Sequence, residues 1–135
     1  MYKHILVPVA FDHAYDGYNP LDVARRLSGP DTRISLLHVM EEIPAYAISY
    51  LPIDYRNESR EAIRTELSAR LEGVPNADAW VVDGHAGRTI LDWAEEHGAD
   101  LIVMASHHPG LGDYLLGSTA ARVVRHAQCA VHVMR

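Results

Sequence analysis

The stretch LIVMASHHPGLGDYLLGST, residues 101–119, decides the fold. It opens with an unbroken aliphatic run, continues through a glycine-rich segment and reaches Ser118. A short continuous apolar run is typical of a strand that is covered on both faces, and serine is a common N-cap residue. The stretch therefore predicts a buried strand over 101–105, a glycine-rich loop, and a helix that begins at Ser118 as its N-cap.

Four further segments have strand character. ILVPV (residues 5–9) and ISLLHVM (residues 34–40) are largely apolar, and AWVVD (residues 79–83) and AVHVM (residues 130–134) are weaker. Nearly continuous apolar strands favour a parallel sheet, because both of its faces are buried.

Helical patterns lie between these strands, over residues 20–27, 57–71, 89–97 and 118–126. Strict alternation of strand and helix predicts an α/β fold, with right-handed crossovers and helices on both faces of the sheet. Since no repeat or linker interrupts the pattern, we expect one domain over residues 1–135. Residues 41–56 fit neither pattern, and we expect either a lid or a short helix there.

Composition limits the classes of partner. Twelve Lys and Arg against 18 Asp and Glu give a formal net charge of −6, which argues against binding to nucleic acid or anionic membrane. The apolar run at the N-terminus is short and meets Pro8, so no export signal is expected, and the protein is expected to be cytoplasmic. The single cysteine, Cys129, is predicted to be an inert buried thiol.

The best candidate for chemistry is the start of the last helix. Ligands of open α/β sheets lie beyond the carboxyl ends of the strands, and a helix N-terminus offers free N–H groups to an anion such as phosphate. The segment 112–119 resembles a Walker loop, but the Walker lysine is missing and the chain's only lysine is Lys3. A P-loop NTPase is therefore excluded, and two interpretations stay open: a phosphate site, or a mobile loop before an ordinary capped helix.

Catalytic and metal sites are not indicated. The nine histidines show no metal-ligand spacing, although His38, His107 and His108 could share the ligand cleft. Asp12 is the best-placed carboxylate, but no G-x-S-x-G nucleophile elbow is present. Residues 83–85 are interpreted as a turn from strand to helix. We therefore assign no catalytic residue.

Three motifs carry a resemblance to a known family: MYKHILVPV at the N-terminus, SLLHV in the second strand, and LLGS-x-A-x-x-VVRHA-x-C-x-V-x-V-x-R at the C-terminus. Together they resemble the universal stress protein family over the whole chain. The resemblance implies a Rossmann-like, adenine nucleotide alpha hydrolase-like sheet of five parallel strands in the order 3-2-1-4-5. It also implies a homodimer formed through the last strand, residues 130–134.

The resemblance further implies an adenine nucleotide, ATP or AMP, with or without Mg²⁺. Nucleotide binders of the family have a motif similar to G-x-x-G-x9-G-[ST] after strand 4. This chain has Ala105 and His108 at the positions of the first two glycines and a shorter interval before Gly117. Its Ser-His-x-Pro stretch is similar to that of small members that lack those glycines. Ala10 stands where binders often carry an acidic residue, and Asp12 is the candidate to replace it.

Carried over position by position, the resemblance assigns Val39 to the adenine, the end of strand 1 to one wall, the end of strand 4 to the floor, and the glycines and helix start to the phosphates. The implied binding residues are Pro8, Val9, Ala10, Asp12, Val39, Met104, Ala105, Ser106, His108, Gly110, Gly117, Ser118 and Thr119. The expected function is that of a regulatory stress-response homodimer whose partner protein is unknown. The alternatives are a dimeric interaction module that binds no nucleotide and a hydrolase of the related superfamily.

Overall fold

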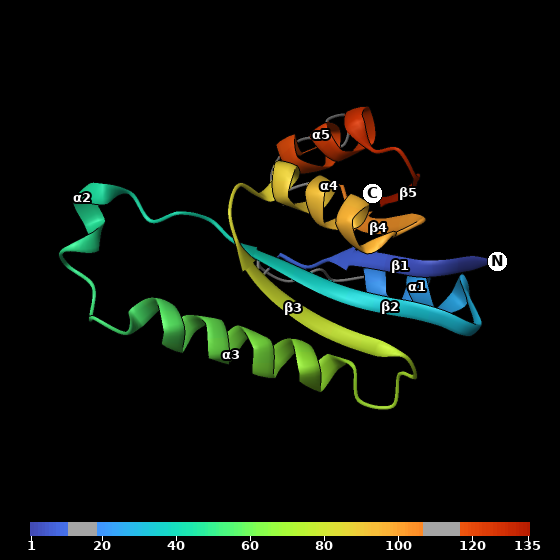
Figure 1. Ribbon diagram of the computed structural model, residues 1–135, viewed down its shortest axis with the longest axis horizontal. Coiled ribbons are helices and arrows are strands. Elements are labelled where there is room, and N and C mark those ends of the chain that lie inside the picture. Colours follow the sequence, from blue (N-terminus) through green and yellow to red (C-terminus); the bar gives the residue numbers. More distant parts are fainter. Residues whose placement is uncertain (11–18, 107–116) are drawn as a thin grey trace.

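The computed structural model describes residues 1–10, 19–106 and 117–135 (Figure 1). The strands are β1 (Tyr2–Pro8), β2 (Ser28–Met40), β3 (Ala77–Asp83), β4 (Leu101–Ala105) and β5 (Ala130–Met134). The helices are α1 (Pro20–Arg26), α2 (Ala45–Ile48), α3 (Tyr55–Arg70), α4 (Ala86–His97) and α5 (Ser118–His126).

The strands form one parallel sheet in the order β3-β2-β1-β4-β5. Strand β1 is central, and its Ile5 lies opposite Ile34 of β2 on one side and Leu101 of β4 on the other. The fold class and the strand order predicted from the sequence are therefore confirmed.

Helices cover both faces of the sheet, with α4 and α5 above it and α3 below it in Figure 1. Alternate residues of β1 point to opposite faces: Ile5 and Val7 join the core under α1 and α3, whereas Leu6 joins the core under α4 and α5. All three side chains are fully buried. This double burial explains why the strand reads as a continuous apolar run.

Local signals define the helix ends. The side chain of Asn19 accepts a hydrogen bond from the Leu21 N–H at 3.0 Å, and Pro20 occupies the first turn of α1, where its missing N–H costs nothing. Helix α4 ends at Gly98, which has φ of 70°. That left-handed conformation is easily adopted only by glycine.

Several boundaries differ from those predicted. Strand β2 starts six residues before the predicted Ile34, because Ser28 pairs with Tyr2 and the Thr32 hydroxyl donates to the Tyr2 carbonyl at 2.7 Å. Helices α3 and α4 also start before their predicted residues, 57 and 89. The contacts that extend β2 join residues that are distant in the chain, so local periodicity does not reveal them.

Residues 41–56 contain the short helix α2, which was one of the two expected outcomes. No residue of α2 is buried, and Figure 1 shows the helix standing apart from the sheet, beyond the carboxyl end of β2. In the parts of the chain that the structure describes, every helix is too short or too polar to traverse a lipid bilayer.

Candidate functional site

The candidate site lies where the strand order reverses. Strand β1 pairs with β2 on one side and with β4 on the other, and the chain leaves β1 and β4 at the same edge of the sheet. We call this the carboxyl edge: the ends of β1, β2 and β4 and the start of α5. Diverging connections at such a position leave room for a ligand.

One side of the carboxyl edge is built from the ends of β1 and β2. The N–H of Val9 donates to the Leu37 carbonyl at 2.8 Å, and the His38 ring nitrogen Nδ1 lies 2.7 Å from the Val9 carbonyl. Because a carbonyl only accepts, Nδ1 carries the hydrogen. His38 therefore holds the backbone of Val9 in place, beside the half-buried Val39 and the exposed Ala10.

The other side is built from the end of β4. Met104 and Ser106 are buried and Ala105 is half-buried. The N–H of Ser106 donates to the Met134 carbonyl at 2.7 Å, and the Ser106 carbonyl accepts the Gly117 N–H at 2.6 Å. The main chain of Ser106 thus joins β4 to β5 and to the residue before α5.

The start of α5 differs from the prediction. Gly117 is the N-cap, with φ of −59° and ψ of 157°, and its carbonyl accepts the first helical hydrogen bond from Ala121 at 2.9 Å. Ser118 is the first residue of the helix, so its assignment as the N-cap is wrong. No side chain among the described residues caps this helix start. Helix α5 therefore presents main-chain N–H groups at the carboxyl edge, beside the exposed Ser118 and the half-buried Thr119.

The structure brings together two groups of predicted site residues at the carboxyl edge. Three predicted residues, Asp12, His108 and Gly110, lie outside the described residues, as does His107. The residues brought to this edge are Pro8, Val9, Ala10, Val39, Met104, Ala105, Ser106, Gly117, Ser118 and Thr119.

A cluster at the end of β3 was not foreseen. The Asp83 carboxylate accepts hydrogen bonds from Arg60 at 2.6 Å and from Arg56 at 3.1 Å, and Arg56 also donates to the carbonyls of Met40 and Glu41. Burial alone would raise the pKa of Asp83, but hydrogen bonds and charge from the two arginines outweigh it and lower that pKa. Arg56 and Arg60 stand one helical turn apart, which is the only sequence signal of this clamp.

Residues 83–85 form the predicted turn from β3 to α4, in which the Gly84 N–H donates to the Met40 carbonyl at 3.0 Å. Gly84 has φ of 150°, and a Cβ at this position would lie 2.3 Å from the Thr89 hydroxyl oxygen. Glycine is therefore required here for a tight turn rather than for a catalytic role.

Metal ligands and reactive thiols are not evident in what the structure describes. Within residues 1–10, 19–106 and 117–135, no three His, Cys, Asp or Glu side chains group as metal ligands would. Cys129 is a free thiol that is half-buried rather than buried as predicted, and burial raises its pKa. A raised pKa lowers the fraction of reactive thiolate, in line with the expected inert cysteine.

The model of the universal stress protein family matches residues 1–135. Universal stress protein G of Shigella flexneri is 30% identical over 142 residues, with all of both chains covered. A universal stress protein of Thermus aquaticus is 33% identical over 144 residues, again with both chains fully covered.

Solved structures have the same fold. The hypothetical protein MJ0577 has a TM-score of 0.81 at 26% identity, covering 99% of this chain and 96% of that protein. UspA from Lactobacillus plantarum has a TM-score of 0.73 at 27% identity, with 99% and 98% covered.

More distant structures of this fold contain adenine nucleotides. A universal stress protein in complex with cAMP has a TM-score of 0.68 at 20% identity, covering 99% of this chain and 97% of that protein. One from Archaeoglobus fulgidus in complex with dAMP has a TM-score of 0.68 at 17% identity, with 99% and 98% covered. A family protein from Arabidopsis thaliana with AMP bound has a TM-score of 0.59 at 18% identity, with 98% and 90% covered.

Proposed function

Because this chain belongs to the universal stress protein family, we propose that it binds an adenine nucleotide at the carboxyl edge and acts as a cytoplasmic regulatory protein. The observation that carries the proposal is the start of α5, where main-chain N–H groups face the edge and no described side chain caps them. Such groups, at the positive end of a helix dipole, are suited to phosphate.

The phosphates are assigned to the first turn of α5. Ser118 and Thr119 each offer an N–H and a hydroxyl group there. The N–H of Gly117 is already donated to the Ser106 carbonyl, so the role proposed for Gly117 is to leave space for a phosphate. Gly110 is the further phosphate contact in this proposal.

The adenine is assigned to the end of β2, where Val39 would offer its main-chain groups to the base. Pro8, Val9 and Ala10 would form the wall, and the His38–Val9 hydrogen bond supports this role because it holds that wall still. Met104, Ala105 and Ser106 would form the floor. Asp12 and His108 complete the proposed set, and Mg²⁺ is part of the proposal only as a companion of ATP.

We propose a regulatory rather than a catalytic role. The chain lacks both the Walker lysine and the nucleophile elbow that would activate a phosphate or an acyl group. A bound nucleotide can then act only through a difference in its affinity for two conformations of the protein. Hydrolysis, where it occurs, is expected to be slow.

Titration calorimetry on protein stripped of bound small molecules tests nucleotide binding. We expect saturable binding of ATP or AMP, and binding of adenosine that is about tenfold weaker or more, since adenosine has no phosphate to accept the α5 N–H groups. Equal affinity for adenosine and AMP would contradict the assignment of α5. Absence of heat with every nucleotide at millimolar concentration would favour the interaction module without a nucleotide.

We also propose that two copies associate through β5. This strand is at the edge of the sheet, and Ala130 and His132 on it are exposed. An edge strand with free main-chain groups can pair with its copy, and a two-fold axis makes that pairing antiparallel. Light scattering is expected to give a dimer for the natural chain and a weakened dimer for His132→Glu, which brings like charges together near the axis. A monomer at micromolar concentration would contradict this pairing.

A further inference from the structure

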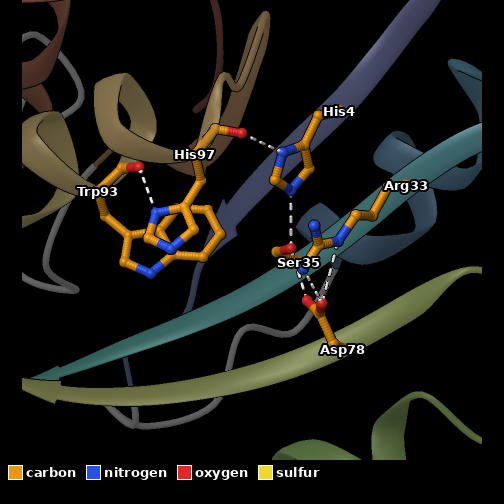
Figure 2. A network of polar contacts seen from close by, with 6 residues as sticks. All are labelled: His4, Arg33, Ser35, Asp78, Trp93 and His97. Atoms are coloured by element: carbon orange, nitrogen blue, oxygen red, sulfur yellow. Dashed lines mark hydrogen bonds and ion pairs between the residues drawn. The ribbon is translucent and has the colours of Figure 1, made fainter.

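A buried polar network joins the first half of β1, the middle of β2 and the start of β3, away from the carboxyl edge (Figure 2). His4 is at its centre and is 6% exposed, and Ser35 is fully buried. The His4 nitrogen Nδ1 lies 3.0 Å from the His97 carbonyl, and Nε2 lies 2.8 Å from the Ser35 hydroxyl oxygen. That hydroxyl lies 2.6 Å from Oδ1 of Asp78.

Each hydrogen atom in this row of hydrogen bonds can be assigned to its donor. The His97 carbonyl can only accept, so Nδ1 of His4 must carry a hydrogen. An ionised Asp78 can also only accept, so Ser35 must donate its single hydroxyl hydrogen to Asp78. The Ser35 oxygen then turns a lone pair toward His4, and Nε2 must carry a hydrogen as well. A ring with hydrogens on both nitrogens is an imidazolium.

The count depends on Asp78 being ionised. Arg33 donates to Oδ2 through Nε at 3.0 Å and through its terminal NH2 group. Burial alone would raise the pKa of Asp78, but the hydrogen bonds from Ser35 and Arg33 and the charge of Arg33 outweigh it and lower that pKa. A neutral Asp78 that passes its hydrogen back through Ser35 would need a proton held beside the Arg33 guanidinium.

The surroundings of His4 also favour a cation. The Asp100 carboxylate accepts the N–H of Lys3 at 2.9 Å and the N–H of His4 at 3.0 Å. The His97 carbonyl belongs to the last residue of α4, at the negative end of the helix dipole. The His97 ring is turned away: it stacks on Trp93 at 3.8 Å, and its Nδ1 lies 2.9 Å from the Trp93 carbonyl.

Charged or titratable residues surround His4 on five segments of the chain. They are Lys3 from β1, Arg33 from β2, Asp78 from β3, His97 from α4 and Asp100 from the turn before β4. Two carboxylates thus stand against Arg33 and the His4 ring, while Lys3 contributes its N–H and its side chain is exposed. An imidazolium balances the two carboxylates.

We propose that His4 is a buried imidazolium in the folded chain at neutral pH, held by the relay from Asp78 through Ser35 and by the end of α4. The proton joins β1, β2, β3 and α4 in one network. Loss of this proton would remove the hydrogen bond between Nε2 and the Ser35 hydroxyl oxygen. This inference is independent of nucleotide binding.

The proposal is tested by nitrogen NMR on the intact chain labelled with ¹⁵N-histidine, at pH 7. The His4 signals are identified by their absence from a His4→Gln sample. We expect both ring nitrogens to show the shift of a protonated nitrogen. A His4 nitrogen with the shift of an unprotonated nitrogen in the natural chain would overturn the proposal.

Two matched variants test the cause. Asp78→Asn turns the acceptor into an amide, which frees the Ser35 hydrogen for Nε2, so His4 is expected to become neutral with its hydrogen on Nδ1. Asp100→Asn removes an equal charge but leaves the relay intact, so His4 is expected to stay an imidazolium. Equal protonation of His4 in the two variants would show that the relay does not hold the proton and would overturn the proposal.

Discussion

The two ends of the sheet differ in how their polar groups are hydrogen-bonded. At the amino end, His4, Ser35 and Asp78 satisfy one another through side-chain hydrogen bonds. At the carboxyl edge, the first turn of α5 presents main-chain N–H groups, and no side chain among the described residues accepts a hydrogen bond from them. Buried polar groups are costly unless they are paired, whereas unpaired donors at a surface are available to a ligand. We therefore attribute a stabilising role to the amino end and propose that the carboxyl edge binds the ligand.

The largest effect on stability is expected from Ser35→Ala. This change removes the partner of both His4 and Asp78 in a fully buried position. Leaving a buried donor unpaired costs about 1–3 kcal/mol, and the expected loss of unfolding free energy is in that range. Urea unfolding followed by circular dichroism measures it.

The same chemical change at the other end is the control. Ser118 is exposed and caps nothing, so Ser118→Ala is expected to change the unfolding free energy by less than about 0.5 kcal/mol. Equal losses for the two variants would remove the distinction between the ends.

Acid should weaken the amino end more than the carboxyl edge. The pKa values of Asp78, Asp83 and Asp100 are all lowered in the folded chain. A carboxyl group with a lowered pKa stabilises the fold above its unfolded value of about 4, and the contribution is lost as the pH falls through the folded value. We therefore expect the unfolding free energy to decrease from about pH 5 downward.

Asparagine variants locate this acid dependence. Asp78 and Asp100 belong to the amino end, whereas Asp83 is the last residue of β3 and lies at the opposite end of the sheet. Urea unfolding of Asp100→Asn at several pH values should show a flatter decrease than the natural chain, because this variant removes a carboxylate with a lowered pKa and keeps His4 protonated, and Asp83→Asn should show a smaller flattening. A steeper acid loss in Asp100→Asn would contradict the role given to this carboxylate.

The smallest effect is expected at the cluster of Arg56, Arg60 and Asp83, which follows α2 in the chain. Arg56 ties the end of β2 to Asp83, while Tyr46 and Tyr50 are exposed beyond it. Arg56→Gln should loosen this segment and increase the rate of chymotrypsin cleavage after these tyrosines a few-fold, with little change in global unfolding, because local opening needs less free energy than unfolding. An unchanged cleavage rate would show that the clamp does not restrain the segment.

Local periodicity in the sequence predicted the buried strands and the fold class. The apolar runs that contain Leu6 and Ile102 are buried on both faces, as their composition indicated, and the alternation of elements predicted the fold. The start of α5 was placed within one residue, but Gly117 rather than Ser118 is the cap. A glycine in an extended conformation caps through its carbonyl, which side-chain preferences do not show.

The network around His4 could not be predicted. His4 and Ser35 are 31 residues apart, and Ser35 and Asp78 are 43 apart. Their contact depends on the register of three strands, and a one-residue slip would turn the side chains to opposite faces. In the sequence alone, His4 is therefore one of nine histidines with no distinguishing role.

The central claim is that main-chain N–H groups of α5 hold the phosphates of a nucleotide. Ser118→Pro removes one of these groups, and Ser118→Ala keeps it while removing the hydroxyl. Proline suits the first position of a helix, and the extended Gly117 before it, with ψ of 157°, is already in the conformation that a following proline requires. The fold should therefore tolerate both variants.

Titration calorimetry of the two variants with the same adenine nucleotide tests the claim most directly. A lost hydrogen bond to a charged group costs about 1.5–3 kcal/mol, so Ser118→Pro is expected to bind roughly tenfold or more weakly than Ser118→Ala. Equal affinity of the two folded variants would show that the Ser118 N–H does not contact the ligand, and would contradict the account.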